Sequence, residues 1–136
     1  MFFKSKITNN AVTSADKSGV ASDPNVGAQA EQAAEHFLHK QGLKTVAKNY
    51  RCKLGEIDLI MAQHDELIFV EVRLRRHSQF ANAAESVTIT KQHKIIKAAQ
   101  YYLQEHQLTD KINCRFDVIA FGKNNEPEWI KNAFTL

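Results

Sequence analysis

The chain has 136 residues, 43% hydrophobic and 24% charged, which is enough for one domain with a sizeable core. No apolar run approaches the roughly 20 residues of a membrane-spanning helix, and the N-terminus lacks the apolar stretch of a secretory signal. The net charge of +3 permits contact with nucleic acid without arguing for it, and two cysteines are too few for a disulfide scaffold. These features predict a cytoplasmic protein with reduced thiols and no membrane partner.

The first 26 residues are rich in Ser, Thr, Asn, Ala and Lys and show little periodicity, so we predict a flexible N-terminal extension over 1–26 and a folded domain over 27–136. From Gly27 to Gln41 the spacing is helical, and Gly42 supplies a stop. The expected buried stripe of this helix comprises Ala30, Ala33, Ala34, Phe37 and Leu38.

Three strands are predicted next, over 43–52, 55–62 and 66–75, followed by a loop over 76–85. Thr88 or Thr90 can cap a second helix that runs to about Gln107, with Ile95, Ala99, Tyr102 and Leu103 as its buried stripe. A strand over 112–121, a turn over 122–125 and a short strand at Trp129–Ile130 complete the domain. The expected class is α/β, in the order helix, three strands, helix, then one or two strands.

Acidic residues alternate with branched apolar residues along the second and third strands. Successive side chains of a strand point to opposite faces, so Glu56 shares a face with Asp58, and Glu71 shares a face with Arg73. The residues between, 63–66, suit a tight turn, so the two strands are expected to pair as a hairpin that brings Asp58 and Glu71 together. Carboxylates gathered in a half-buried place repel each other, and a divalent cation relieves that repulsion.

An acid on one strand and an acid two residues before a cation on the next meet the needs of metal-dependent phosphodiester cleavage. Such a reaction uses a Mg²⁺-like ion with hard oxygen ligands, here Asp58 and Glu71, and a nearby cation, here Arg73. Glu31 stands at the edge of the first helix's apolar stripe, among small alanines that permit a close approach to the sheet, so it can lean toward the acids.

Several further cations could contact phosphates. Lys91 occupies an edge position on the second helix and can reach the acids, whereas Lys94, Arg75 and Arg76 are solvated charges suited to contact with a nucleic-acid backbone. The same strand patterns also occur on solvent-facing sheets, where cross-strand ion pairs add a few tenths of a kcal/mol, and that alternative stays open. Arg115 and Asp117 share a face of their strand and are interpreted as a structural ion pair next to the site.

Taken together, several short motifs give the chain a specific resemblance from Gly27 to about Phe134. They are Gly27-x-x-Ala30-Glu31-x-x-Ala34, Asn49-x-Arg51, Gly55-Glu56-Ile57-Asp58-Leu59-Ile60, Phe69-Val70-Glu71-Val72-Arg73-x-Arg75, Val87-Thr88-x-x-Lys91 and Arg115-Phe116-Asp117-Val118. With these motifs the chain resembles the YraN family of small bacterial proteins, which are predicted to be endonucleases.

The resemblance implies a restriction-endonuclease-like core, α-β-β-β-α-β with a mixed sheet flanked by helices, related to archaeal Holliday-junction resolvases and the wider PD-(D/E)xK nucleases. In that pattern Glu31 is the helix acid, Asp58 and Glu71 are the strand acids that hold Mg²⁺ or Mn²⁺ with Glu31, and Arg73 stands where a lysine is usual. Arginine stays charged at any workable pH, so this departure weakens the case for efficient cleavage more than the case for metal or phosphate binding.

The expected function is therefore metal-dependent endonucleolytic hydrolysis of nucleic acid, with branched or single-stranded DNA as the expected substrate. A nuclease fold that binds nucleic acid but cuts weakly or not at all is the first alternative, and a protein-interaction or regulatory role is the second. Resolvases commonly act as pairs because two strands are cut, whereas a monomer suits a single-strand nuclease, so both a homodimer and a monomer stay open.

Overall fold

The computed structural model describes residues 25–74, 87–122 and 124–135. The predicted N-terminal extension, apart from its last two residues, and the predicted loop over 76–85 lie outside the described residues, as do Arg75 and Arg76. The elements are α1 (Val26–Lys40), β1 (Lys44–Cys52), β2 (Gly55–Gln63), β3 (Glu66–Leu74), α2 (Ile89–Glu105), β4 (Asn113–Phe121) and β5 (Pro127–Phe134). The expected mixed α/β order, helix, three strands, helix, strand, is confirmed.

The five strands form one mixed sheet in the spatial order β1-β2-β3-β4-β5. β1–β2, β2–β3 and β4–β5 are antiparallel, whereas β3 and β4 are parallel. Parallel neighbours need a crossover connection, and α2 lies within that connection. The hairpin expected from the acidic strands is confirmed, with His64 and Asp65 in its turn and Leu59 opposite Val70.

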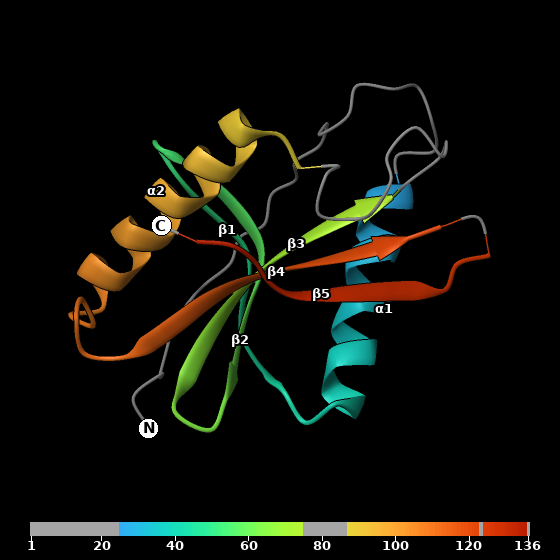
Figure 1. The fold of residues 1–136 in the computed structure, drawn as a ribbon, viewed down its shortest axis with the longest axis horizontal. Coiled ribbons are helices and arrows are strands. Elements are labelled where there is room, and N and C mark those ends of the chain that lie inside the picture. The colour runs from blue at the N-terminus through green and yellow to red at the C-terminus, as the bar shows by residue number, and fades with distance from the viewer. Residues whose placement is uncertain (1–24, 75–86, 123, 136) are drawn as a thin grey trace.

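The two helices cover opposite faces of the sheet, as Figure 1 shows. Ala30, Ala34 and Leu38 of α1 pack with one set of strand side chains, including Val70 and Ile119. A second core lies under α2 and contains Ile95, Ala98, Ala99 and Tyr102 together with side chains such as Phe69 and Phe116. Because both faces are covered, the middle of β2 and β3 is buried on both sides rather than alternating between core and water.

The ends of both helices follow from local chemistry. After α1, Gly42 adopts a φ of 95°, a left-handed conformation that glycine takes at little steric cost, and the Leu43 N–H donates to the Leu38 carbonyl. Before α2, the Thr88 hydroxyl accepts a hydrogen bond from the Lys91 N–H at 3.1 Å, so Thr88, not Thr90, is the cap.

Three expectations need correction. Ala33 is exposed, so it does not belong to the buried stripe of α1, and α2 ends at Glu105, two residues before Gln107. The last strand is longer than the predicted Trp129–Ile130, because β5 pairs with β4 from Pro127 to Phe134. None of the helices in the described part of the chain is long and apolar enough to cross a membrane.

The Arg115–Asp117 ion pair is confirmed and lies within a larger buried network. Asp117 is fully buried and accepts hydrogen bonds from the Arg115 guanidinium, from Trp129 Nε1 at 2.8 Å and from the Asn132 N–H at 2.9 Å. Arg115 Nη1 also lies 2.8 Å from Glu66 at the start of β3. The network therefore joins β3, β4 and β5, and it extends toward Glu66 rather than toward Glu71.

Replacing Asp117 by alanine should destabilise the fold strongly. The change leaves the Arg115 guanidinium, the Trp129 indole N–H and the Asn132 N–H without their buried acceptor, which we expect to lower the free energy of unfolding by about 3–5 kcal/mol. Urea denaturation followed by circular dichroism measures this loss. The exposed Asp65→Ala is the control, and a loss for Asp117→Ala no larger than for that control would contradict the structural role of the network.

Candidate metal centre

Asp58 on β2 and Glu71 on β3 lie side by side beneath α2. The two residues are 5% and 4% exposed, and the Glu71 carboxyl shares a hydrogen bond with Asp58. Leu67, Phe69 and Glu71 alternate along one face of β3, and the first two are buried. The acids therefore occupy an otherwise apolar face that a helix covers, which excludes the alternative of a solvent-facing sheet surface for this pair.

The register pairs between β2 and β3 end next to Asp58. The β2–β3 register runs from Gln63↔Glu66 to Leu59↔Val70, and beyond it Asp58 Oδ2 accepts a hydrogen bond from the Val72 N–H at 2.8 Å. On the other side, Asn49 falls between the pairs Lys48↔Leu59 and Tyr50↔Ile57, and it has a φ of 52°. The Asp58 carboxylate thus replaces a backbone acceptor and is fixed against β3.

Two cations approach the same oxygen of Glu71. Arg73 Nη1 and Lys91 Nζ each lie 3.6 Å from Glu71 Oε2. Their side chains are about one-third exposed, at 34% and 32%, whereas that of Glu71 is 5% exposed. Both cations can therefore reach solvent, or a ligand at the surface, while they remain next to a buried carboxyl group.

Burial controls the protonation of Glu71. Removal from water raises the pKa of the Glu71 carboxyl, and the neighbouring Asp58 charge raises it further. Lys91 and Arg73 act in the opposite direction, but they do not offset burial and the Asp58 charge. Glu71 therefore keeps its proton near neutral pH, and its carboxyl group lies beside that of Asp58.

The donor set fits a hard divalent cation. Mg²⁺ and Mn²⁺ prefer carboxylate and carbonyl oxygens, and Mg²⁺ usually takes one or two carboxylates plus substrate phosphate and water. Across the ranges that the structure describes, no group of three or more His, Cys, Asp or Glu side chains is gathered to hold a metal. A metal ion held by these two carboxylates would therefore need further ligands, such as water or phosphate.

Glu31 lies on α1, the helix on the opposite face of the sheet from α2. It is partly buried between Ala30 and Ala34, which pack against the sheet. Its participation with Asp58 and Glu71 in metal binding stays a prediction. Among the predicted phosphate contacts, Lys91 lies beside Glu71 and Lys94 is exposed one turn further along α2, whereas Arg75 and Arg76 lie outside the described residues.

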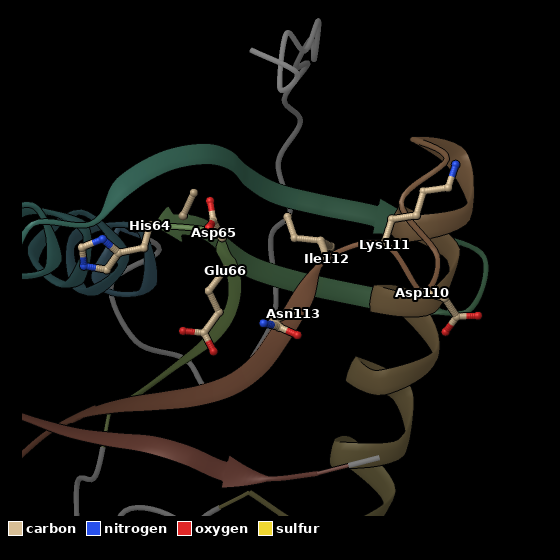
Figure 2. A pocket seen from close by; sticks show the side chains of 8 residues that line it. His64, Asp65, Glu66, Asp110, Lys111, Ile112 and Asn113 are labelled. Atoms are coloured by element: carbon tan, nitrogen blue, oxygen red, sulfur yellow. The ribbon is translucent and has the colours of Figure 1, made fainter.

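A different cavity, of about 730 Å³, opens at the other end of the hairpin. It lies between the β2–β3 turn and the segment that precedes β4, and Figure 2 shows the side chains that line it. His64 projects to one side of this cavity and Lys111 to the other, so these groups do not converge on one point. Glu66 lines this cavity and lies about 17 Å along β3 from Glu71, because the two acids are five positions apart in the strand.

Reasoning from periodicity missed the backbone conformation of Asn49. Asn49 lies within β1, and its left-handed φ of 52° is a conformation that asparagine adopts more readily than most residues. Asparagine is also depleted in strands, so its place in the middle of a predicted strand was the available signal. No comparable sequence pattern predicted the hydrogen bond from the Val72 N–H to Asp58.

Comparisons with known proteins agree with the motifs. The family described as "Uncharacterised protein family UPF0102" matches residues 30–121. The chain is 51% identical over 114 residues to a "UPF0102 protein" of Aeromonas hydrophila, an alignment that covers 83% of this chain and 87% of that protein. It is 50% identical over 117 residues to a "UPF0102 protein" of Saccharophagus degradans, covering 86% of this chain and 98% of the relative. A Coxiella burnetii relative is 49% identical, with 82% and 92% covered.

Glu71→Gln should stabilise the metal-free protein at alkaline pH. Because the pKa of Glu71 is raised on folding from its ordinary value of 4.5, the folded protein keeps a proton that the unfolded chain loses above that pH. Stability must then fall as the pH rises toward the folded-state pKa, and the neutral glutamine removes this loss. In EDTA at pH 8 we expect the variant to melt at least about 4 °C higher, the effect of roughly 1 kcal/mol in a domain of this size.

Thermal melts from pH 5 to pH 8 measure this effect, and the exposed Glu126→Gln is the matched control. Added Mg²⁺ or Mn²⁺ should raise the melting temperature of the parent and of Glu126→Gln but not of Glu71→Gln, because the variant lacks one of the two carboxylates. A Glu71→Gln protein that melts below the parent at every pH would contradict this account of the buried pair.

Proposed function

The chain belongs to the UPF0102 family, and from that membership together with the buried acid pair we propose that it is a Mg²⁺- or Mn²⁺-dependent endonuclease acting on nucleic acid. The observation that most supports this proposal is that Asp58 and Glu71 adjoin in a nearly dry place where their mutual repulsion is relieved by a proton. Such an arrangement costs stability, and it is typical of sites whose ligand supplies the missing positive charge. From the YraN resemblance, branched or single-stranded DNA is the proposed substrate.

The carboxylates of Asp58 and Glu71 would hold the ion, with Glu31 as a further acid. When bound, Mg²⁺ or Mn²⁺ supplies positive charge that activates water and offsets the charge developing on the phosphate. Asp58 is suited to this role because the Val72 N–H fixes one of its oxygens at 2.8 Å, beside the Glu71 carboxyl. Glu71 would release its proton as the ion enters, so the affinity for the metal should increase with pH.

Arg73 and Lys91 would bind the phosphate. Each approaches Glu71 from a partly exposed position, so each can turn toward a phosphate oxygen at the surface without leaving the site. Arginine cannot accept a proton at any workable pH, so Arg73 orients the substrate and stabilises negative charge rather than acting as a base. Lys94, Arg75 and Arg76 are the proposed contacts to more distant parts of the backbone.

A nucleic-acid-binding module that cuts weakly or not at all is the second candidate. Arg73 is the observation that favours it, because the wider nuclease pattern that the chain resembles has lysine there, whereas YraN relatives carry either lysine or arginine. The two candidates share the same phosphate contacts and differ in whether the bound strand is hydrolysed. They are therefore separated by cleavage assays and not by binding assays.

Asp58→Asn should abolish both metal binding and cleavage. Asparagine keeps the size of aspartate and its oxygen can still accept from the Val72 N–H, so the change removes charge with little change of shape. We expect the calorimetric heat of Mn²⁺ binding to disappear and cleavage of branched and single-stranded DNA to fall by at least about 100-fold. Asp65→Asn, in the hairpin turn, is the matched control. Cleavage that survives Asp58→Ala combined with Glu71→Ala would sink this assignment.

The two candidates make opposite predictions for Arg73→Lys. If the protein is an endonuclease, Arg73→Lys should cleave at least as fast as the parent, because lysine keeps the charge, and Arg73→Gln should lose at least about tenfold. The rate of product formation on gels, with Mg²⁺ and Mn²⁺ in turn, measures this. Salt-sensitive binding of DNA without cleavage by the parent or by Arg73→Lys would instead establish the binding module.

A further inference from the structure

A groove of about 500 Å³ lies between α2 and the turn that joins β1 to β2. Four of the described residues that line it are cations, and Glu56 is the single carboxylate among them. The cations are Arg51 from β1, Lys53 from the turn, and Lys91 and Lys94 from α2. Reasoning from strand periodicity gave no role to Arg51 or Lys53, because both flank the turn rather than the acidic strands.

The charges in this groove are only partly compensated. Arg51 Nε lies 3.2 Å from Glu56 Oε1, directly across the β1–β2 pair, so one cation is matched by the groove's own acid. Lys91 is engaged by Glu71 at 3.6 Å. Lys53 and Lys94 are exposed on opposite walls. A cleft lined by one sign of charge concentrates the field between its walls and attracts the opposite charge.

The walls of the groove are held close together. A side chain at Gly55 would place its Cβ only 2.6 Å from the Lys94 carbonyl oxygen, so the turn packs directly on the backbone of α2. Residue 55 can therefore be glycine alone without moving one wall from the other. The positions of Lys53 and Lys94 relative to each other follow from this backbone contact and not from a flexible linker.

The groove is continuous with the acid pair. Lys91 lines the groove and its Nζ also lies 3.6 Å from Glu71 Oε2, so one side chain belongs to both. Leu54, which is 47% exposed, stands at the tip of the same turn and offers an apolar surface. An unpaired base has an open face that can contact such a surface, whereas the bases of a duplex are stacked on one another.

We propose that this groove binds the sugar–phosphate backbone of a single nucleic-acid strand and leads it to Asp58 and Glu71. Lys53 and Lys94 bind successive phosphates, Lys91 binds the phosphate nearest the acids, and Leu54 contacts a base. This inference rests on the proposed nucleic-acid function and adds to it a path and a strand preference. It assigns Lys53 to a binding site and places Lys94 opposite it.

The test is binding of a fluorescein-labelled single-stranded DNA in EDTA, measured by anisotropy over a series of salt concentrations. Lys53→Gln combined with Lys94→Gln removes two groove cations that take part in no ion pair described above. For single strands each lost phosphate contact lowers the slope of log affinity against log salt by about 0.7, so the slope should fall by about 1.4 and the affinity roughly tenfold near 0.1 M salt. Lys53→Glu alone should weaken binding more than Lys53→Gln.

The matched control is Lys44→Gln combined with Lys111→Gln, which removes the same charge at the opposite end of the sheet. Lys44 and Lys111 are exposed, and Lys111 lines the other cavity, seen in Figure 2. This control should bind within about twofold of the parent with an unchanged slope, since net charge alone acts only through a screened field. Thermal melts of all variants establish that each is folded.

Two outcomes separate this inference from the proposed function. If the parent cleaves DNA but the Lys53/Lys94 variant binds like the control, the groove is not the path and the endonuclease proposal stands. If the variant loses binding as expected but the parent neither cleaves DNA nor binds Mn²⁺, the groove is the backbone site of a binding module and the endonuclease proposal falls. Equal affinity of the parent for a blunt duplex and for the single strand would overturn the strand preference.

Discussion

The organisation of this site depends on two carboxyl groups that meet out of contact with water. An ionised carboxylate is costly to bury, and a second one beside it adds repulsion to the loss of hydration. Glu71 meets this constraint by keeping its proton and by the approach of Arg73 and Lys91, whereas Asp58 accepts a hydrogen bond from the Val72 N–H. Under the proposed function, a divalent cation would supply positive charge that offsets the remaining cost of burying the pair.

Different elements of the fold place the charged groups on the two faces of the sheet. The parallel pairing of β3 and β4 requires a crossover, and α2, which lies in that crossover, begins at its Thr88 cap three residues before Lys91. On the far side of the sheet the Asp117 network joins β3, β4 and β5, so charged groups stabilise the sheet there without entering the acid pair. The two buried polar regions differ in one respect. Asp117 accepts several hydrogen bonds, whereas Glu71 faces two cations beyond hydrogen-bond distance.

The hairpin and the residues that meet in it could be predicted from the sequence, because they follow from the alternation of residues within single strands and from helical spacing. Alternation of acids with apolar residues gave the hairpin and the meeting of Asp58 with Glu71, and helical spacing placed Lys91 toward them. The rest depends on tertiary contacts that no short window contains. The burial of the pair requires α2 to cover it, the anchoring of Asp58 requires the Val72 N–H on β3, and the basic groove requires Gly55 to pack on Lys94. The extent of β5 likewise follows from pairing with β4, not from its own alternation.

Under the proposed function, the charges of the site would connect metal binding to phosphate binding. Without a metal, Glu71 keeps a proton near neutral pH and lies beside the two cations Arg73 and Lys91. A divalent ion that displaces the proton would balance both carboxylates by itself, which leaves Arg73 and Lys91 without a partner at the surface. An anionic phosphate would then satisfy both side chains, and by reciprocity a bound phosphate would favour the ion. The acid pair and the groove are therefore best understood as a single electrostatic unit, in which the ion and the backbone would bind cooperatively.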